Sequence, residues 1–289
     1  MTTGVSATLP VRSISVHEVV PSSASADSPV REERYSRERE YFDAIAAQIR
    51  IEKMPVSLVD RYREPQWPRL FPLEMMFYLL GREGGQKVLQ VGSGDGLTGV
   101  QLAHCGHRVT GVEISPRSVE VARQRARIED VDAEFVVGNV VTDDIWDEGA
   151  YDVVWCEAVL HHLVGDLDTV ISGACRALRP GGLFVSAEPL ALPRWLASVR
   201  DRMPVTRNGT QDEQPLRKTE IDTVRRYFPG LRIHRYRILA RIDRFTGSVP
   251  LIGIVSALDN VLLALPPVRP FSSVAVMWAR KPGAPSVTG

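Results

Sequence analysis

Short apolar runs alternate with longer segments of helical periodicity through the middle of the chain. The runs are too short for helices and are bounded by glycine, proline and polar residues, which is typical of buried strands. The segments between them repeat apolar residues at helical spacing. This alternation predicts an α/β fold with a mostly parallel sheet and helices on both faces. The expected strands are residues 88–91, 108–112, 133–137, 152–156, 183–187, 231–242 and 273–280.

Start and stop signals place the helices between these strands. Ser115 followed by Pro116 combines a capping hydroxyl with a proline at the first turn, and therefore predicts a helix start. Thr219 is expected to cap a further helix that reaches Phe228. Other helices are expected from Leu97 onward and over residues 167–178, the latter ending in a turn at 179–182, and an apolar helix is expected over 251–265.

The ends of the chain differ from this alternating middle. Residues 1–30 have a composition that orders poorly. Residues 31–82 predict a helical cap that begins with a charged helix over 31–50 and includes a second helix over 73–80. The main domain is expected over 83–281, with a substrate lid at 190–218 and a tail at 282–289. The apolar edge of the first helix is expected to consist of Tyr35, Tyr41, Phe42, Ile45 and Ile49.

A glycine-rich loop follows the first expected strand. Gly92, Gly94 and Gly96 alternate with Ser93 and Asp95. Glycines allow a sharp turn and let a ligand lie against the backbone without meeting a Cβ. The next strand ends on Glu113, whose carboxylate can accept hydrogen bonds from both hydroxyls of a ribose. The spacing is not the dinucleotide pattern G-x-G-x-x-G, but the unit predicts a nucleotide site.

Two later motifs follow this loop, YDVVWCEAVLHHL and RALRPGGLFVSAEP. In order and spacing, the loop, Glu113 and these motifs resemble class I S-adenosylmethionine-dependent methyltransferases over about residues 75–281. The resemblance implies a Rossmann-like, seven-stranded sheet with an antiparallel last strand and an N-terminal helical cover. Gln90 departs from the family, which usually has an acid there. The implied contacts to S-adenosyl-L-methionine are Tyr41, Gln90, Gly92, Ser93, Gly94, Gly96, Glu113, Ile114, Asn139, Val140 and Glu157.

Some of these assignments have a structural alternative. Asn139 offers an amide oxygen to the adenine amino group, but asparagine after a strand also forms turns. Tyr41 either covers the cofactor or packs as a core aromatic residue. The arginines of the expected lid either meet an anionic substrate or lie in solvent; they are Arg200, Arg202, Arg207 and Arg217.

Four residues at the ends of the fourth and fifth strands are the candidate catalytic groups. These are Glu157, His161, His162 and Glu188, because open parallel sheets bind ligands outside the carboxyl ends of their strands. A histidine here can take a proton near neutral pH, and His161 shares a helix face with Glu157 if the segment is helical. The two histidines are expected to diverge by about 100°. A purely structural histidine pair is the alternative. No metal site is predicted, since adjacent residues chelate poorly and no third ligand is evident.

The amino-acid composition limits the kinds of molecule that the protein is expected to bind. The 289 residues are 44% hydrophobic and 24% charged, with a net charge of zero, so no electrostatic signature of nucleic-acid binding appears. The apolar window at 251–265 contains Asp259, which argues against membrane insertion. Three cysteines without metal spacing favour a cytoplasmic location. The expected function is methyl transfer to carbon, nitrogen or oxygen of a small molecule in secondary metabolism. The protein is a candidate homodimer. Cyclisation on the same fold and an inactive cofactor-binding module are the alternative functions.

Overall fold

A seven-stranded sheet forms the centre of the computed structural model, which describes residues 29–193, 213–239 and 249–283. The strand order is β3-β2-β1-β4-β5-β7-β6. Neighbouring strands from β3 to β5 are parallel, whereas β7 runs antiparallel to both β5 and β6. The predicted Rossmann-like α/β fold is confirmed. The strands are β1 (Lys87–Val91), β2 (Arg108–Glu113), β3 (Ala133–Val137), β4 (Tyr151–Glu157), β5 (Leu178–Pro189), β6 (Arg232–Tyr236) and β7 (Val274–Arg280).

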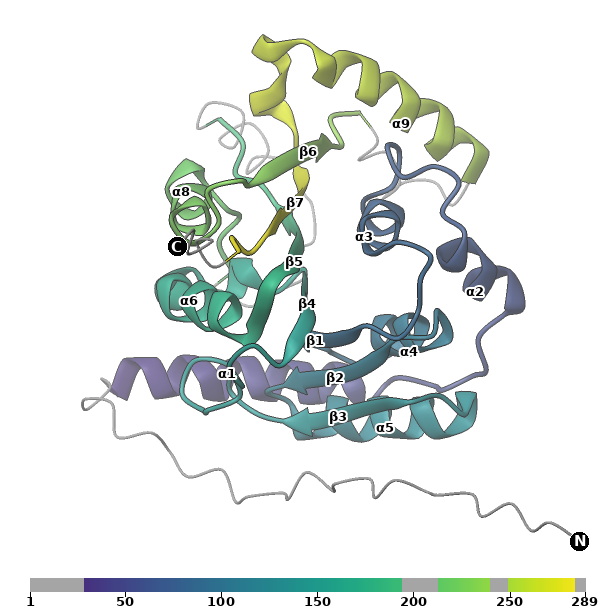
Figure 1. Cartoon of the computed structure of the whole chain (residues 1–289), viewed down its shortest axis with the longest axis vertical. Helices are drawn as coiled ribbons and strands as arrows, with labels where there is room; N and C mark the ends of the chain where they lie inside the picture. Colours follow the sequence, from purple (N-terminus) through teal and green to yellow (C-terminus); the bar gives the residue numbers. More distant parts are fainter. Residues whose placement is uncertain (1–28, 194–212, 240–248, 284–289) are drawn as a thin grey trace, which may run out of the picture.

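Helices cover both faces of the sheet (Figure 1). One layer holds α3, α4 and α5, and the opposite layer holds α6 and α8, which pack on each other. Short 3-10 turns, η1 and η2, connect β4 to α6. The bounds are α2 (Val56–Arg63), α3 (Pro72–Leu80), α4 (Leu97–His104), α5 (Pro116–Glu129), η1 (Leu160–His162), η2 (Val164–Asp166), α6 (Leu167–Ala177), α8 (Lys218–Tyr227), α9 (Val249–Ala264) and η4 (Pro266–Phe271).

The apolar runs that predict the strands are buried on both faces. Trp155 in the middle of β4 is fully buried and meets Phe77 of α3 edge-on. On the other face, Phe184 of β5 stacks on Phe228, which follows α8. Burial on both sides explains why these strands read as continuous apolar runs rather than alternating ones.

Some local predictions are wrong. Thr219 lies in the first turn of α8 and does not cap it; Arg217 is the N-cap residue, because Glu220 reaches back to accept a hydrogen bond from its backbone N–H. The turn at 179–182 lies inside the long strand β5, where the register against β4 shifts. The helix α2 is not among the elements predicted from the sequence.

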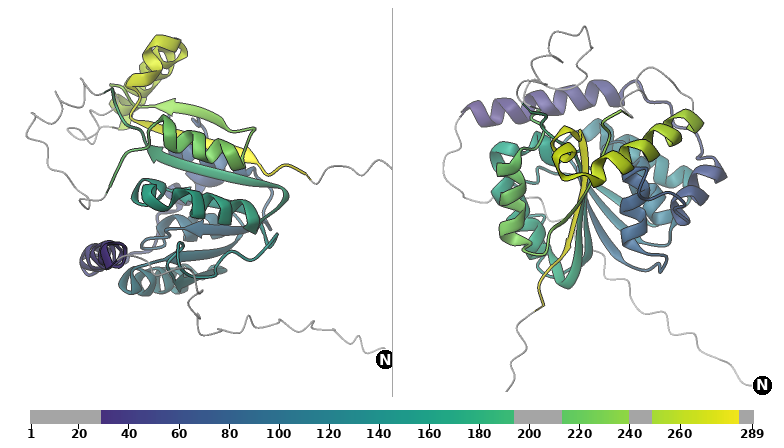
Figure 2. Two further views of the ribbon diagram at one scale, coloured as in Figure 1. Left: turned by 90° about the vertical axis from the view of Figure 1, so that its left-hand side faces the viewer. Right: turned by 90° about the horizontal axis from the view of Figure 1, so that it is seen from above.

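The first helix, α1 (Pro29–Ala46), crosses the carboxyl ends of the strands (Figure 2, right). Its inward side matches the predicted aromatic edge only in part. Tyr35 is buried and Tyr41 and Phe42 are half-buried, as expected, but Ile45 is 42% exposed and Ile49 lies beyond the helix, and the charged Glu38 is buried instead. The helix therefore covers the sheet edge with a largely polar face.

The apolar helix α9 lies over β6 (Figure 1). Its Asp259 is buried and accepts hydrogen bonds from the backbone N–H groups of Ile238 and Leu239, which end the segment after β6. Within the described ranges, no helix has the length and apolar character needed to cross a membrane.

Candidate active site

The glycine loop between β1 and α4 is a tight turn with three left-handed residues. Gly92, Gly94 and Gly96 have φ of +66°, +53° and +78°. A Cβ on Gly92 would lie 2.5 Å from Val159, and one on Gly96 would lie 2.5 Å from Ala122, so packing requires glycine at both positions. A Cβ on Gly94 would meet nothing within 4 Å. The loop therefore leaves open space beside Gly94.

Glu113, at the end of β2, holds this loop. Its carboxylate accepts hydrogen bonds from the backbone N–H groups of Gly94 and Ser115, each at 3.0 Å. Burial raises the pKa of Glu113, while backbone hydrogen bonds from Ser115, Gly94 and Ile114 act in the opposite direction.

Two polar atoms near the loop are buried without a hydrogen-bond partner among the described residues. They are Ser93 Oγ and Gln90 Oε1. Ser93 belongs to the glycine loop, and its hydroxyl is available to a ligand. Gln90 lies deeper, because its amide oxygen is 2.6 Å from the place of a Cβ on Gly99 in α4. Gln90 therefore points under the helix.

The remaining predicted cofactor contacts are distributed along the same edge. Asn139 Oδ1 accepts a hydrogen bond from the backbone N–H of Val141 at 3.0 Å, which is the turn interaction named above as the alternative. Val140 is buried and Ile114 is half-buried. Tyr41 packs edge-on against Phe42 on α1. The role of each in ligand binding stays a prediction.

Two polar clusters fix α1 across the edge. Asp43 accepts hydrogen bonds from Ser115 Oγ at 2.5 Å and from the backbone N–H of Arg117 at 3.1 Å. On the other side, Arg31, Arg34 and Tyr35 all contact the buried carboxylate of Asp166 in η2. The helix thus spans from the start of α5 to the segment after β4.

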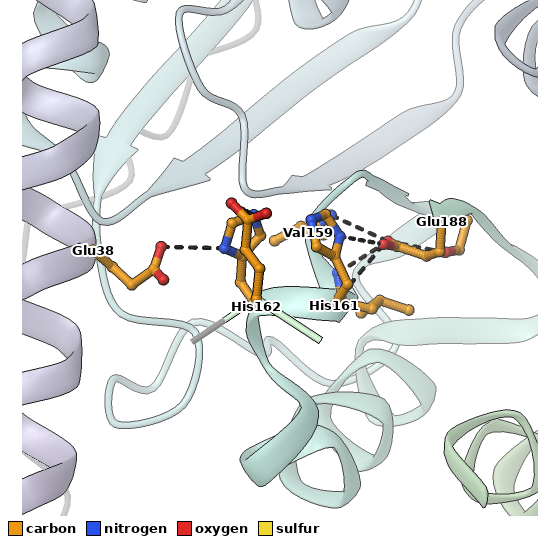
Figure 3. A network of polar contacts seen from close by, with 8 residues as sticks. Glu38, Val159, His161, His162 and Glu188 are labelled. Atoms are coloured by element: carbon orange, nitrogen blue, oxygen red, sulfur yellow. Dashed lines mark hydrogen bonds and ion pairs between the residues drawn. The ribbon is translucent and has the colours of Figure 1, made fainter. Parts of the chain in front are cut away.

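Glu188 organises the segment that follows β4. Its Oε1 accepts hydrogen bonds from the backbone N–H groups of Val159 at 3.1 Å and Leu160 at 2.9 Å, and its Oε2 lies 2.8 Å from His161 Nδ1 (Figure 3). The side chain is 1% exposed. Glu188 therefore pairs with His161 and with the backbone of η1.

The two histidines lie side by side, so the predicted divergence is wrong. Their ring centroids are 4.2 Å apart with an interplanar angle of 44°, because η1 is a single tight turn that starts after Ala158, whose φ is +51°. His162 Nδ1 lies 3.2 Å from Glu38 Oε2 and its Nε2 lies 3.7 Å from Glu213 Oε1. Burial lowers the pKa of His162, but Glu38, Glu213 and Glu188 together raise it above its usual value.

Glu157 does not share a helix face with His161, since it is the last residue of β4. Its Oε2 lies 3.5 Å from Trp155 Nε1. Burial raises the pKa of Glu157, and the charges of Glu188 and Asp95 act in the same direction, whereas hydrogen bonds from Thr98 and Trp155 lower it.

Two residues that contact His162, Glu38 and Glu213, were not predicted from the sequence. Arg31, Arg34, Tyr35 and Glu38 repeat at helical spacing, and this polar periodicity was the available signal for Glu38.

A groove of about 1390 Å³ adjoins the histidines. Its lining includes Glu213, so the groove and the histidine cluster share a residue. Arg225, Arg235 and Arg269 also line it, and burial together with the two other arginines lowers the pKa of Arg235. Arg217 lines the groove as well, whereas Arg200, Arg202 and Arg207 of the expected lid lie outside the described residues.

Comparison with known proteins assigns the central part of the chain. The sequence profile described as "Methyltransferase domain" matches residues 88–182, from β1 through the turn in β5. These residues form a class I S-adenosylmethionine-dependent methyltransferase domain. This methyltransferase domain contains the glycine loop, Glu113 and both histidines.

Curated relatives match part of the chain. The chain is 34% identical over 135 residues to a ubiquinone biosynthesis O-methyltransferase of Cronobacter sakazakii, and the match covers 45% of this chain and 55% of the relative. A protein of the same name from Xanthomonas oryzae is 36% identical over 103 residues, covering 35% and 43%. The chain spans about half the length of the curated relatives it matches.

Solved structures share the fold at low sequence identity. The geranyl diphosphate C-methyltransferase of Streptomyces coelicolor, in complex with Mg²⁺, geranyl diphosphate and S-adenosyl-L-homocysteine, superposes with a TM-score of 0.53 at 16% identity, covering 89% of this chain and 100% of that one. The phosphoethanolamine N-methyltransferase 2 of Haemonchus contortus gives a TM-score of 0.53 at 15% identity, covering 86% and 59%. These similarities extend the methyltransferase fold beyond residues 88–182.

Proposed function

We propose that this protein transfers a methyl group from S-adenosylmethionine to a small-molecule acceptor. The observation that carries the proposal is Glu113, whose carboxylate is held at the end of β2 directly beside the open space at Gly94. An acid in this place is suited to a ribose, and a glycine with no side chain leaves room for the rest of the cofactor. The donor set therefore fits the cofactor expected from the sequence.

Different residues at the carboxyl ends of the strands would bind different parts of the cofactor. Glu113 would hold the ribose, while Gly94 and the partnerless hydroxyl of Ser93 would lie against the amino-acid part. When bound, S-adenosylmethionine supplies an electrophilic methyl group on its sulfonium. The cover helix α1 shields this edge from water through its contacts with Asp166 and Ser115. Positioning and exclusion of water are sufficient for much of the rate of such a displacement.

The acceptor would occupy the groove beside the histidines. Arg225, Arg235 and Arg269 favour an acceptor with a negatively charged group, because arginine binds carboxylates and phosphates in fixed geometry. The volume of the groove, about 1390 Å³, is large enough for a small-molecule acceptor. The names of the curated relatives favour oxygen as the atom that is methylated. We retain secondary metabolism as the proposed setting of the reaction.

A direct test is to incubate the protein with S-adenosylmethionine labelled on its methyl group and an extract of the source cell. Mass spectrometry should show S-adenosylhomocysteine together with one product heavier by the labelled methyl group. Formation of an unlabelled product with intact cofactor would point instead to a reaction such as cyclisation. Cofactor binding without any product would support an inactive binding module.

Replacing Glu113 with alanine should weaken S-adenosylmethionine binding by about ten- to a hundredfold. Hydrogen bonds to a charged group contribute roughly 1.5–3 kcal/mol, and the variant loses those to the ribose. Calorimetry measures the affinity. Glu134→Ala, at an exposed site on β3, is the matched control and should bind normally. The melting temperature of Glu113→Ala must be checked because the glycine loop also loses its acceptor. Unchanged affinity in a folded Glu113→Ala variant would refute the ribose assignment.

A further inference from the structure

Three side chains that lie close together, one of which also lines the acceptor groove, suggest a metal site. His161, His162 and Glu213 each offer one ligand atom, and these atoms all lie within 4.8 Å of one another. Two residues come from η1 after β4, and the third comes from the segment before α8. We infer that His161, His162 and Glu213 bind a divalent metal ion of the zinc class. The inferred ion would sit beside the acceptor and thus rests, for its role, on the proposed function.

A carboxylate lies close to the Nδ1 atom of each imidazole, as is common for histidines that bind a metal. His161 Nδ1 lies 2.8 Å from Glu188, and His162 Nδ1 lies 3.2 Å from Glu38 (Figure 3). Histidines that bind a metal through one ring nitrogen almost always direct the other nitrogen to a carboxylate, a backbone carbonyl or water. Here a carboxylate faces Nδ1 of each ring, which leaves the two Nε2 atoms as ligands.

Glu188 adds rigidity to this arrangement. Its second oxygen is bound by the backbone N–H groups of Val159 and Leu160, so the carboxylate that orients His161 is itself fixed. The rings are held 4.2 Å apart, and this places two ligands together without requiring a helix turn between them. Adjacent histidines chelate poorly on an ordinary helix, but the 3-10 turn of η1 removes that objection.

The donor set indicates which ions are suitable. Two imidazole nitrogens and one carboxylate form a known set for catalytic zinc, with a fourth position open to water or substrate. Magnesium prefers oxygen ligands and retains its waters, so it is disfavoured at this site. Glu213 also lines the acceptor groove. The open position would therefore be available to an oxygen or nitrogen atom of the acceptor.

Metal binding and general-base catalysis make different use of the same atoms. As a general base, one histidine would need a free Nε2, and only that histidine would be essential. As ligands, both histidines and Glu213 are needed together. The distinction is measurable on the protein alone, before any acceptor is known, because the base requires no metal.

The test uses full-length, untagged protein freed of metal with a chelator. Titration with Zn²⁺ in a calorimeter should show one tight site per chain, and Mg²⁺ should show none. Co²⁺ should give the intense visible absorption of a four-coordinate ion with nitrogen and oxygen ligands. The absence of a stoichiometric Zn²⁺ site would overturn the inference. S-adenosylmethionine binding is measured separately, so that failure of the proposed function is recognised independently.

Substitutions locate the site. Glu213→Gln, His161→Gln and His162→Gln should each abolish stoichiometric Zn²⁺ binding, and Glu188→Gln should weaken it by about ten- to a hundredfold. His104→Gln is the matched control, because His104 forms a similar pair with Glu129 at the C-terminal ends of α4 and α5, and it should leave the Zn²⁺ affinity unchanged. Since His161 is tied to buried Glu188, the half-exposed Glu213 is the variant least able to disturb folding. Normal Zn²⁺ binding by a folded Glu213→Gln protein would refute this ligand set.

Discussion

Replacing Gly94 with valine is expected to abolish measurable binding of S-adenosylmethionine. A Cβ at this position meets nothing within 4 Å of the protein, so the valine side chain would occupy the space assigned to the cofactor. Gly94 also has a φ of +53°, where a β-branched residue is strained by about 1–3 kcal/mol. The affinity is measured by calorimetry and the strain by the melting temperature.

Gly149→Val separates these two effects. Gly149 has a φ of +65° and open space around it, but it lies in the loop before β4, at the opposite edge of the sheet. It should therefore lower the melting temperature to a similar extent and leave the cofactor affinity intact. Equal affinity in the Gly94 and Gly149 variants would mean that the glycine loop is only a structural turn.

Deleting residues 1–50 should abolish turnover and weaken cofactor binding, because it removes α1 from the sheet edge. The sequence predicts that residues 1–30 contribute little, so a protein that lacks residues 1–30 should retain its turnover. Turnover is measured as release of S-adenosylhomocysteine with an acceptor identified in the extract. Equal activity of the two truncated proteins would contradict the assignment of α1 as a cover.

A point substitution tests the same role of α1 without deleting any residues. Asp43→Ala deletes the acceptor that binds Ser115 Oγ and the backbone of Arg117, and so releases one end of α1. Asp60→Ala, on the exposed side of α2, is the matched control. Raised dissociation of the cofactor only in Asp43→Ala would indicate that docking of α1, rather than the mere presence of the helix, retains the ligand.

The sheet was predictable because its signals are local. Val88 to Val91 are buried on both faces, and Ser115 caps α5 by accepting a hydrogen bond from the backbone N–H of Ser118, as its position before Pro116 indicates. The glycine loop was predictable for the same reason, since the left-handed conformation of each glycine depends only on residues next to it in the sequence. The ends of helices were less predictable. Arg217 is the N-cap of α8 because the side chain of Glu220 accepts a hydrogen bond from its backbone N–H.

The histidine cluster was not predictable because its contacts join distant parts of the chain. Glu38 and Glu213 reach His162 from α1 and from the segment before α8, and no local pattern links either one to it. The orientation of His161 depends on Glu188, which lies on a different strand. Helical geometry alone predicted diverging rings, and the 3-10 turn after Ala158 placed them together instead.

The polar underside of α1 has a consequence for how the protein opens. A cover that buries mainly apolar side chains must expose them to water each time it lifts, and its opening is then coupled to the stability of the core. Here the two attachment points consist of carboxylates with hydroxyl, guanidinium and backbone N–H partners, all groups that water can hydrate. Under the proposed function, lifting α1 to release product would break these polar attachments, whose groups water can hydrate. Opening would therefore be coupled less strongly to the stability of the core than the opening of an apolar cover.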